Sequence, residues 1–179
     1  HKMKAKKIST VFTLLFLFFS HSSAVTSKGT SGAAFLKIGV GAKPISMGEA
    51  SAAVADSAEI IYWNPGGLVK LKRISLALSH NEWLQQIKHE YIGLAVPIKG
   101  IGTFGLSGIY LSMDNLEGWD KSDARSTDFT ASDLAGGLSY AVELKKNVGF
   151  GINLKYIQQT IEKEKAMAYA GDIGFLFML

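Results

Sequence analysis

The chain has 179 residues, no cysteine and a formal net charge of +4 at pH 7. Without cysteine it can form neither a disulfide framework nor a thiolate metal site. Its first 24 residues carry four lysines and no acidic residue, so the rest of the chain is formally neutral. A neutral chain lacks the clustered, uncompensated Lys and Arg that phosphate binding needs, and we therefore exclude nucleic acid as a partner.

Residues 1–24 have the pattern of a secretory signal peptide. Lys4, Lys6 and Lys7 precede an apolar run over residues 8–19, and small residues follow it up to Ala24. We expect cleavage between Ala24 and Val25 and export through the inner membrane. The apolar run is shorter than the roughly 20 residues of a membrane-spanning helix, which makes a retained anchor helix the less favoured alternative.

Residues 25–70 follow the leader and are rich in Gly, Ala and Ser. We expect a lead-in followed by a compact segment. Residues 46–58 are predicted to form a short helix, with Ser46 as its N-cap and Glu49 as the capping-box partner. The run Asn64-Pro65-Gly66-Gly67 is predicted to interrupt regular structure, because proline fixes its backbone angle and glycine permits positive φ.

From residue 71 onward, large apolar residues alternate with small or polar ones. Ile74, Leu76 and Leu78, for example, are separated by Ser75 and Ala77. A period of two is the signature of a β-strand with two different faces. The pattern predicts an all-β, antiparallel chain with six strands, over residues 74–79, 91–96, 103–110, 129–142, 149–156 and 169–177.

The composition of the second strand face favours a membrane protein. A soluble β-sandwich normally presents Lys, Glu, Thr and Arg on its outer face. Here the second face is mostly Gly, Ala and Ser, which suits the crowded lumen of a transmembrane barrel whose large apolar face meets lipid. The alternative is a glycine-rich soluble β-protein.

The expected loop lengths alternate strictly between short and long along the chain. Residues 98–101 and 143–147 are expected to be short connections, whereas residues 81–90, 112–128 and 158–166 are expected to be long. Transmembrane barrels have short periplasmic turns and longer external loops. On this arrangement, we expect interface aromatics at the strand ends: Tyr91, Tyr110, Tyr140, Phe150, Tyr156, Tyr169 and Phe177.

Four ordered blocks carry a resemblance to a known family. They are AFLKIGVGA at residues 34–42, SMGEA at 46–50, AVAD at 53–56 and IYWNPGGL at 61–68. Together they strongly resemble the amino-terminal part of the PorV/PorQ-like proteins, within the FadL-type outer-membrane transporters of hydrophobic compounds. The match is clearest over residues 34–68 and looser in the strands.

The resemblance implies a fourteen-stranded FadL-like barrel whose amino-terminal hatch folds back into the lumen. The family hatch carries an Asn-Pro-Ala motif, which Asn64 and Pro65 match, while Gly66 stands in place of alanine. The implied hatch site comprises Trp63, Asn64, Pro65, Gly66 and Gly67. Because only six strands follow the hatch, we expect residues 71–179 to be the first strands of a barrel truncated at its carboxy terminus, in the outer membrane of a Gram-negative cell.

Other chemical motifs are weaker. Gly39-Val40-Gly41 lacks the third glycine of a dinucleotide loop. His80, Glu82, His89 and Glu90 could ligate a metal, but a solvated loop is the better interpretation. The acidic stretch of residues 112–128, with Asp114 and Asp128 among its carboxylates, leaves calcium binding as an alternative. No arrangement identifies an activated nucleophile, so we predict no enzyme activity, no catalytic residue, no cofactor and no metal.

The leading hypothesis is a barrel that lets small hydrophobic compounds cross the outer membrane passively, with outer-membrane lipid and the hydrophobic ligand as partners. The gate would include Trp63, Asn64, Pro65 and Gly66. One alternative is a PorV-like shuttle or attachment component of type IX secretion, which would dock secreted cargo protein on residues 81–90 and 112–128. A weaker alternative is a soluble secreted β-domain.

Overall fold

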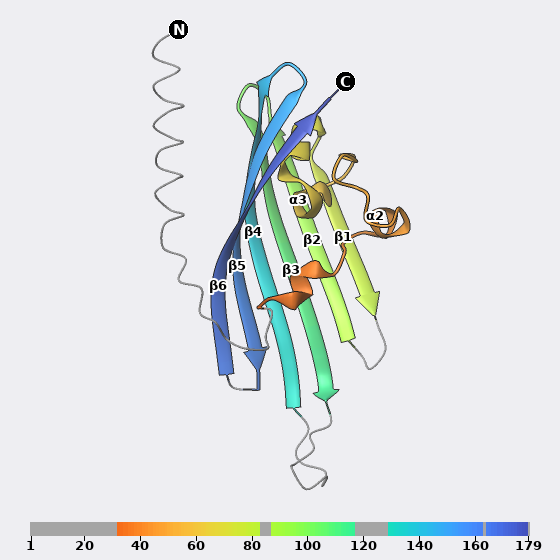
Figure 1. Cartoon of the computed structure of the whole chain (residues 1–179), viewed down its shortest axis with the longest axis vertical. Helices are drawn as coiled ribbons and strands as arrows, with labels where there is room; N and C mark the ends of the chain where they lie inside the picture. Colours follow the sequence, from red (N-terminus) through yellow and green to blue (C-terminus); the bar gives the residue numbers. More distant parts are fainter. Residues whose placement is uncertain (1–31, 83–86, 117–128, 163, 179) are drawn as a thin grey trace, which may run out of the picture. The chain divides into compact units, whose positions relative to one another are not determined.

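The computed structural model describes residues 32–82, 87–116, 129–162 and 164–178 (Figure 1). The predicted leader and its cleavage site at Ala24 and Val25 lie outside these residues. Ala33–Leu179 form one compact unit, so the segment before the first strand and the strands belong together.

Six strands make up most of the described chain, and every consecutive pair runs antiparallel in the order β1-β2-β3-β4-β5-β6. This confirms the predicted all-β, antiparallel architecture and the number of strands. Each strand is longer than its apolar alternation alone indicated. The strands are β1 (Ser75–Glu82), β2 (Ile87–Ile98), β3 (Gly102–Leu116), β4 (Phe129–Lys145), β5 (Val148–Ile161) and β6 (Glu164–Phe177).

The two faces of the sheet differ as the alternation predicted. In register, Leu106 lies opposite Leu138, which lies opposite Leu154, so that one face carries large apolar side chains across β3, β4 and β5. We call this the outer face. Ser107 and Gly137 pair on the other face, which we call the inner face. It carries mostly small and polar residues, together with a few buried large ones such as Ile109, Leu111 and Ile157.

Residues 33–74, which we call the amino-terminal cover, lie over the inner face. Tyr91 of β2 donates a hydrogen bond to Ala58 O (3.1 Å), and Ser75 of β1 accepts one from Ala58 N (3.0 Å). The cover contains short helical turns: η2 (Ala34–Lys37), α2 (Ala42–Ser46), α3 (Ile60–Trp63) and η3 (Pro65–Lys70).

The hydrophobic core lies between the cover and the inner face. Ile60, Ile61 and Leu68 of the cover are fully buried, and Ala95 and Ala141 are fully buried on the facing strands. The small strand residues leave room for the larger cover residues, because a Cβ at Gly105 would lie 2.9 Å from Ile61 Cδ1. Among the described residues, no helix is long and apolar enough to cross a bilayer.

The predicted helix over residues 46–58 is wrong. The structure places a five-residue helix, α2, just before it, and this helix ends at Ser46. Ser46 Oγ donates to Lys43 O (2.8 Å) and so does not cap a following helix. Gly48 and Glu49 both have φ of 65°, in the left-handed region that ends a right-handed helix.

Regular structure also continues where the sequence predicted an interruption. Asn64 ends α3 in an extended conformation, with φ of −161°, and Pro65 then opens the 3-10 helix η3 at its first position. Proline fits there because the first turn of a helix has no partner for its missing N–H.

The predicted alternation of short and long loops is also wrong. β1 and β2 extend through most of residues 81–90 and leave only residues 83–86 between them, while β5 and β6 leave only residues 162 and 163. Cross-strand pairs such as Glu82 with Lys88 and Thr160 with Lys165 allow the ladders to continue past the apolar residues. The long connection that remains from the prediction is residues 117–128, between β3 and β4.

Candidate functional site

Asn64 occupies the junction between α3 and η3 and is nearly buried, with 9% of its surface exposed. Its backbone N–H donates to Ile60 O (2.8 Å), which closes α3. Its backbone carbonyl accepts from Gly67 N (2.9 Å), and its side-chain Oδ1 accepts from Gly66 N (3.0 Å). The residue therefore ends one helical turn and caps the next.

The side-chain amide of Asn64 also joins the cover to the sheet. Its Nδ2 donates to Ala52 O (2.8 Å) in the cover and to Phe175 O (3.0 Å) in β6. Both amide hydrogens and the carbonyl oxygen thus have partners. An asparagine side chain supplies this combination of two donors and one acceptor, which a carboxylate cannot do because it only accepts.

Glycines on β5 and β6 let the Pro65-Gly66 turn approach the strand backbone directly. A Cβ at Gly151 would lie 2.6 Å from Gly66 N, and one at Gly149 would lie 2.6 Å from Gly66 O. A Cβ at Gly66 would itself lie 2.7 Å from Gly174 O. The glycine at position 66, where the resemblance led us to expect alanine, is therefore required by this close backbone contact.

Two neighbouring aromatic residues of α3 hold the first part of the cover. Tyr62 OH lies 2.9 Å from both Leu36 O and Ile38 O, and Trp63 Nε1 donates to Val40 O (3.0 Å). The two rings meet edge to face with centroids 4.8 Å apart. Residues 36–40 are thus attached to α3 by side-chain hydrogen bonds to backbone carbonyls.

The environment of Tyr62 favours its neutral form. Burial raises the pKa of the Tyr62 hydroxyl to about 12, and the carboxylates of Glu49 and Asp172 add to this shift. A neutral hydroxyl keeps the hydrogen that the carbonyls of residues 36 and 38 accept. The contact is therefore intact throughout the physiological pH range.

A polar network follows the inner face of β4, β5 and β6. Ser139 Oγ donates to Asn153 Oδ1 (2.9 Å), and Asn153 Nδ2 donates to Asp172 Oδ2 (3.1 Å). The same carboxylate oxygen pairs with Lys155 Nζ at 2.8 Å. The sequence analysis described this face as mostly Gly, Ala and Ser and did not identify the network. A signal was present in β5, where the polar residues Asn153 and Lys155 follow Gly149 and Gly151 at consecutive inner-face positions.

Most of the predicted interface aromatics lie on the outer face. Tyr156 packs against Tyr169 with ring centroids 5.6 Å apart, and Phe150 packs against Phe175 at 5.1 Å, both pairs with tilted rings. The outer-face set from the prediction is Tyr110, Tyr140, Phe150, Tyr156, Tyr169 and Phe177. Their location at a membrane interface stays a prediction.

Tyr91 does not fit that prediction. It lies on the inner face with 3% of its surface exposed, and its hydroxyl donates to the cover at Ala58 O. The sequence placed Tyr91 at a strand end, whereas β2 begins four residues earlier at Ile87. In the structure Tyr91 contributes to attachment of the cover.

The residues considered as metal ligands lie on opposite faces of the sheet. His80 Nδ1 and Glu90 Oε1 are 2.6 Å apart and exposed on the outer face. His89 is buried on the inner face, where its ring nitrogens have no hydrogen-bond partner among the described residues. The side chains of the acidic stretch from Asp114 to Asp128 lie outside the described residues.

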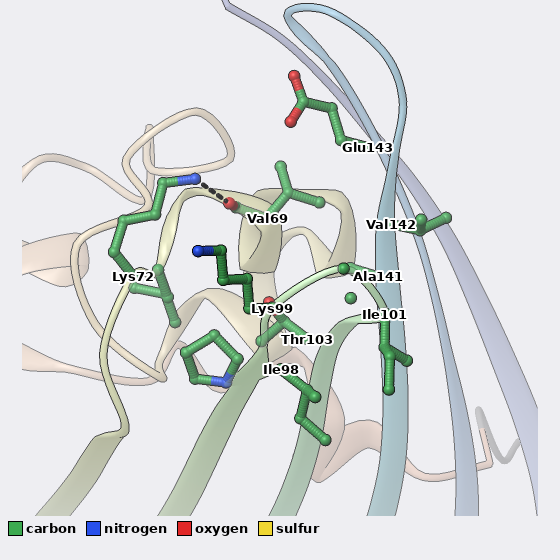
Figure 2. A pocket seen from close by; sticks show the side chains of 13 residues that line it. Val69, Lys72, Ile98, Lys99, Ile101, Thr103, Ala141, Val142 and Glu143 are labelled. Carbon is green, nitrogen blue, oxygen red and sulfur yellow. Dashed lines mark hydrogen bonds between the residues drawn. The ribbon is translucent and has the colours of Figure 1, made fainter.

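A pocket of about 530 Å³ opens where the cover meets the β2–β3 turn and the last part of β4. Figure 2 shows Val69 and Lys72 of the cover facing Lys99 and Thr103 of the β2–β3 region, with Glu143 at the end of β4. Lys72 Nζ donates to Val69 O (3.2 Å). Sequence reasoning did not predict this pocket, because its walls come from three separate segments.

No protein-family model, curated protein or solved structure matches this chain. The resemblance to the PorV/PorQ-like proteins therefore stays a prediction based on the residues of the cover.

Changing Asn64 to Asp should loosen the cover. The substitution retains an acceptor for Gly66 N but removes both donors and brings a carboxylate beside Ala52 O and Phe175 O. We expect a loss of about 2–4 kcal/mol in the free energy of detaching the cover. Protease cleavage within residues 33–70 at increasing urea concentration measures it. The matched control is Asn147→Asp in the exposed β4–β5 turn, and equal cleavage of the two variants would contradict the role of Asn64.

The raised pKa of Tyr62 predicts a pH-dependent stability. Below pH 10 the tyrosine is neutral in both folded and unfolded chains, and its full contribution is present. Between pH 10 and about 12 the unfolded chain ionises first, so this contribution is lost as the pH rises. The difference between the 295 nm titrations of the wild type and Tyr62→Phe should be centred near pH 12. A difference centred near pH 10 would show that Tyr62 is not buried in the folded chain.

Proposed function

We propose that this protein is an outer-membrane β-barrel protein of the FadL type that admits small hydrophobic compounds by passive diffusion. The observation that carries the proposal is the outer face. Leu76, Leu138 and Leu154 are 61%, 57% and 61% exposed on three different strands, and Phe177 is 73% exposed. A continuous sheet face of large apolar side chains is unstable in water and stable in lipid.

The height of the apolar band is consistent with this placement. On β5 the outer positions run from Val148 to Tyr156 without a charged residue. Eight residue steps cover about 26 Å along a strand. At the tilt of 35–45° found in transmembrane barrels this becomes about 20 Å, near the band of about 25 Å that such barrels present to lipid.

The band ends at a similar level on all six strands. At the end of the sheet opposite the β2–β3 turn, the outer positions change from apolar to polar or charged within one or two cross-strand pairs. The first such residues are His80, Glu90, Ser112, Ser132, Gln158 and Lys165. A common boundary is expected where strands leave hydrocarbon for the polar headgroup region.

The cover supports the hydrophobic-uptake part of the proposal. It occupies the inner face as the hatch of the resembling family would, and its large buried residues Ile60, Ile61 and Leu68 are apolar. An apolar solute gains little from a water-filled pore, whereas it can pass along a route lined by such side chains. Trp63, Asn64, Pro65 and Gly66 are the proposed gate.

A lysine introduced on one sheet face at a time distinguishes a face that contacts lipid from a face that contacts water. Leu154→Lys on the outer face should reduce stability in phosphatidylcholine vesicles by about 2–4 kcal/mol, whereas Ala168→Lys on the exposed inner face of β6 should change it by less than about 1 kcal/mol. Urea unfolding from vesicles measures both. If Leu154→Lys instead leaves the chain folded and more soluble in buffer, the soluble secreted domain is the better interpretation.

Uptake of a radiolabelled hydrocarbon by cells with and without the full-length gene tests the transport step. We expect faster uptake with the gene, and no gene-dependent change for a small hydrophilic solute taken up through porins. Equal hydrocarbon uptake would contradict the transport proposal. Equal uptake together with recovery of exported proteins on the purified barrel would favour the secretion-shuttle alternative.

A further inference from the structure

Six basic residues belong to the segments at the end of the sheet that holds the β2–β3 and β4–β5 turns, or to the part of the cover just before β1. All six are exposed to solvent. We call them the basic collar: Lys70, Lys72, Arg73, Lys99, Lys145 and Lys146. Glu143 is the acidic residue of the same turns, and its carboxylate accepts from Asn147 N (3.0 Å), so it stabilises the β4–β5 turn.

The other end of the sheet has no comparable excess among the described residues. There His80 pairs with Glu90, while Lys88 faces Glu82 across β1 and β2. In the sequence around Lys165, residues 162–165 hold two glutamates and two lysines and are formally neutral. The positive charge is therefore concentrated at one boundary of the apolar band.

The pocket between the cover, the β2–β3 turn and the last part of β4 contains two residues of the basic collar, and Glu143 also lines it (Figure 2). Lys72 and Lys99 line it together with apolar Val69 and Pro97. Ile98 and Ile101, which also line it, are 42% and 55% exposed and adjoin the outer face. Cationic and apolar groups thus meet at the edge of the surface proposed to contact lipid.

We propose that this pocket binds the phosphate headgroup of an anionic glycerophospholipid. Lys72 and Lys99 pair with the phosphate, and the acyl chains continue along the exposed side chains of Ile98, Ile101 and Phe104. The inference rests on the proposed membrane placement, since it needs a lipid beside the outer face. A free phosphate could use the lysines but would gain nothing from the adjoining apolar surface.

The remaining collar residues add a less specific attraction. Each Lys or Arg near an anionic membrane surface favours binding by about fivefold, and salt weakens the effect within a Debye length. The lysines of the pocket differ from Lys145 and Lys146 in having an apolar wall beside them. The pocket lysines should therefore determine which lipid is retained after detergent extraction.

The test uses the product of the full-length gene folded into vesicles of phosphatidylcholine alone or with 30% phosphatidylglycerol. After detergent extraction, mass spectrometry counts the phosphatidylglycerol retained per protein. The pocket variant is Lys72→Gln with Lys99→Gln, and the control is Lys88→Gln with Lys165→Gln at the opposite end. We expect retention to fall on the order of tenfold in the pocket variant and to remain unchanged in the control.

Equal retention by both double variants would overturn the inference. Displacement of the retained lipid by millimolar inorganic phosphate would also overturn it, because the site would then be a free-anion site. If the wild-type chain enters neither kind of vesicle, the membrane placement fails and the inference fails with it. Normal insertion with no preference for phosphatidylglycerol contradicts the inference alone and leaves the proposed function standing.

Discussion

The packing of the Pro65-Gly66 turn against the glycines of β5 and β6 is the contact on which the rest of the arrangement depends. Backbone meets backbone there, and a Cβ at Gly66 or Gly151 would approach other main-chain atoms to 2.7 Å or less. Asn64 holds the turn at this distance by donating to Phe175 O (3.0 Å). This contact fixes one end of the amino-terminal cover over β5 and β6, and the hydrogen bonds of Ala58 with Ser75 and Tyr91 attach it to β1 and β2.

The same contact explains the division of residue sizes between the two sheet faces. The inner face must be small beneath the cover, because Ile61 and Leu68 fill the space above it and are fully buried. The outer face has no such cover in the described residues and carries most of the large side chains of the strands. This distribution reverses that of a soluble sheet, in which large apolar residues point toward the protein interior.

The sequence predicted what depends on local alternation and missed what depends on distant contacts. Strand number and the two faces were predictable, because a period of two persists through residues such as Phe104, Leu106 and Phe150. The strand ends were not, since the ladders continue through paired polar residues. The helix over residues 46–58 failed because the conformation of the cover is set by its attachment to β6, which lies more than 100 positions along the chain from Asn64.

Different parts of the cover are attached with different strengths, and this difference determines which part can open at the lowest cost. Removing it entirely would expose Ile60, Ile61 and Leu68, each of which contributes about 1.5–3 kcal/mol through burial. Releasing residues 36–40 from α3 would instead break the hydrogen bonds made by Tyr62 and Trp63, at about 0.5–1.5 kcal/mol each. A local movement of residues 36–40 is therefore less costly than displacement of the Asn64 turn. In the proposed transport, the Trp63 side of the gate would therefore move, while Asn64, Pro65 and Gly66 would form its fixed side against β5 and β6.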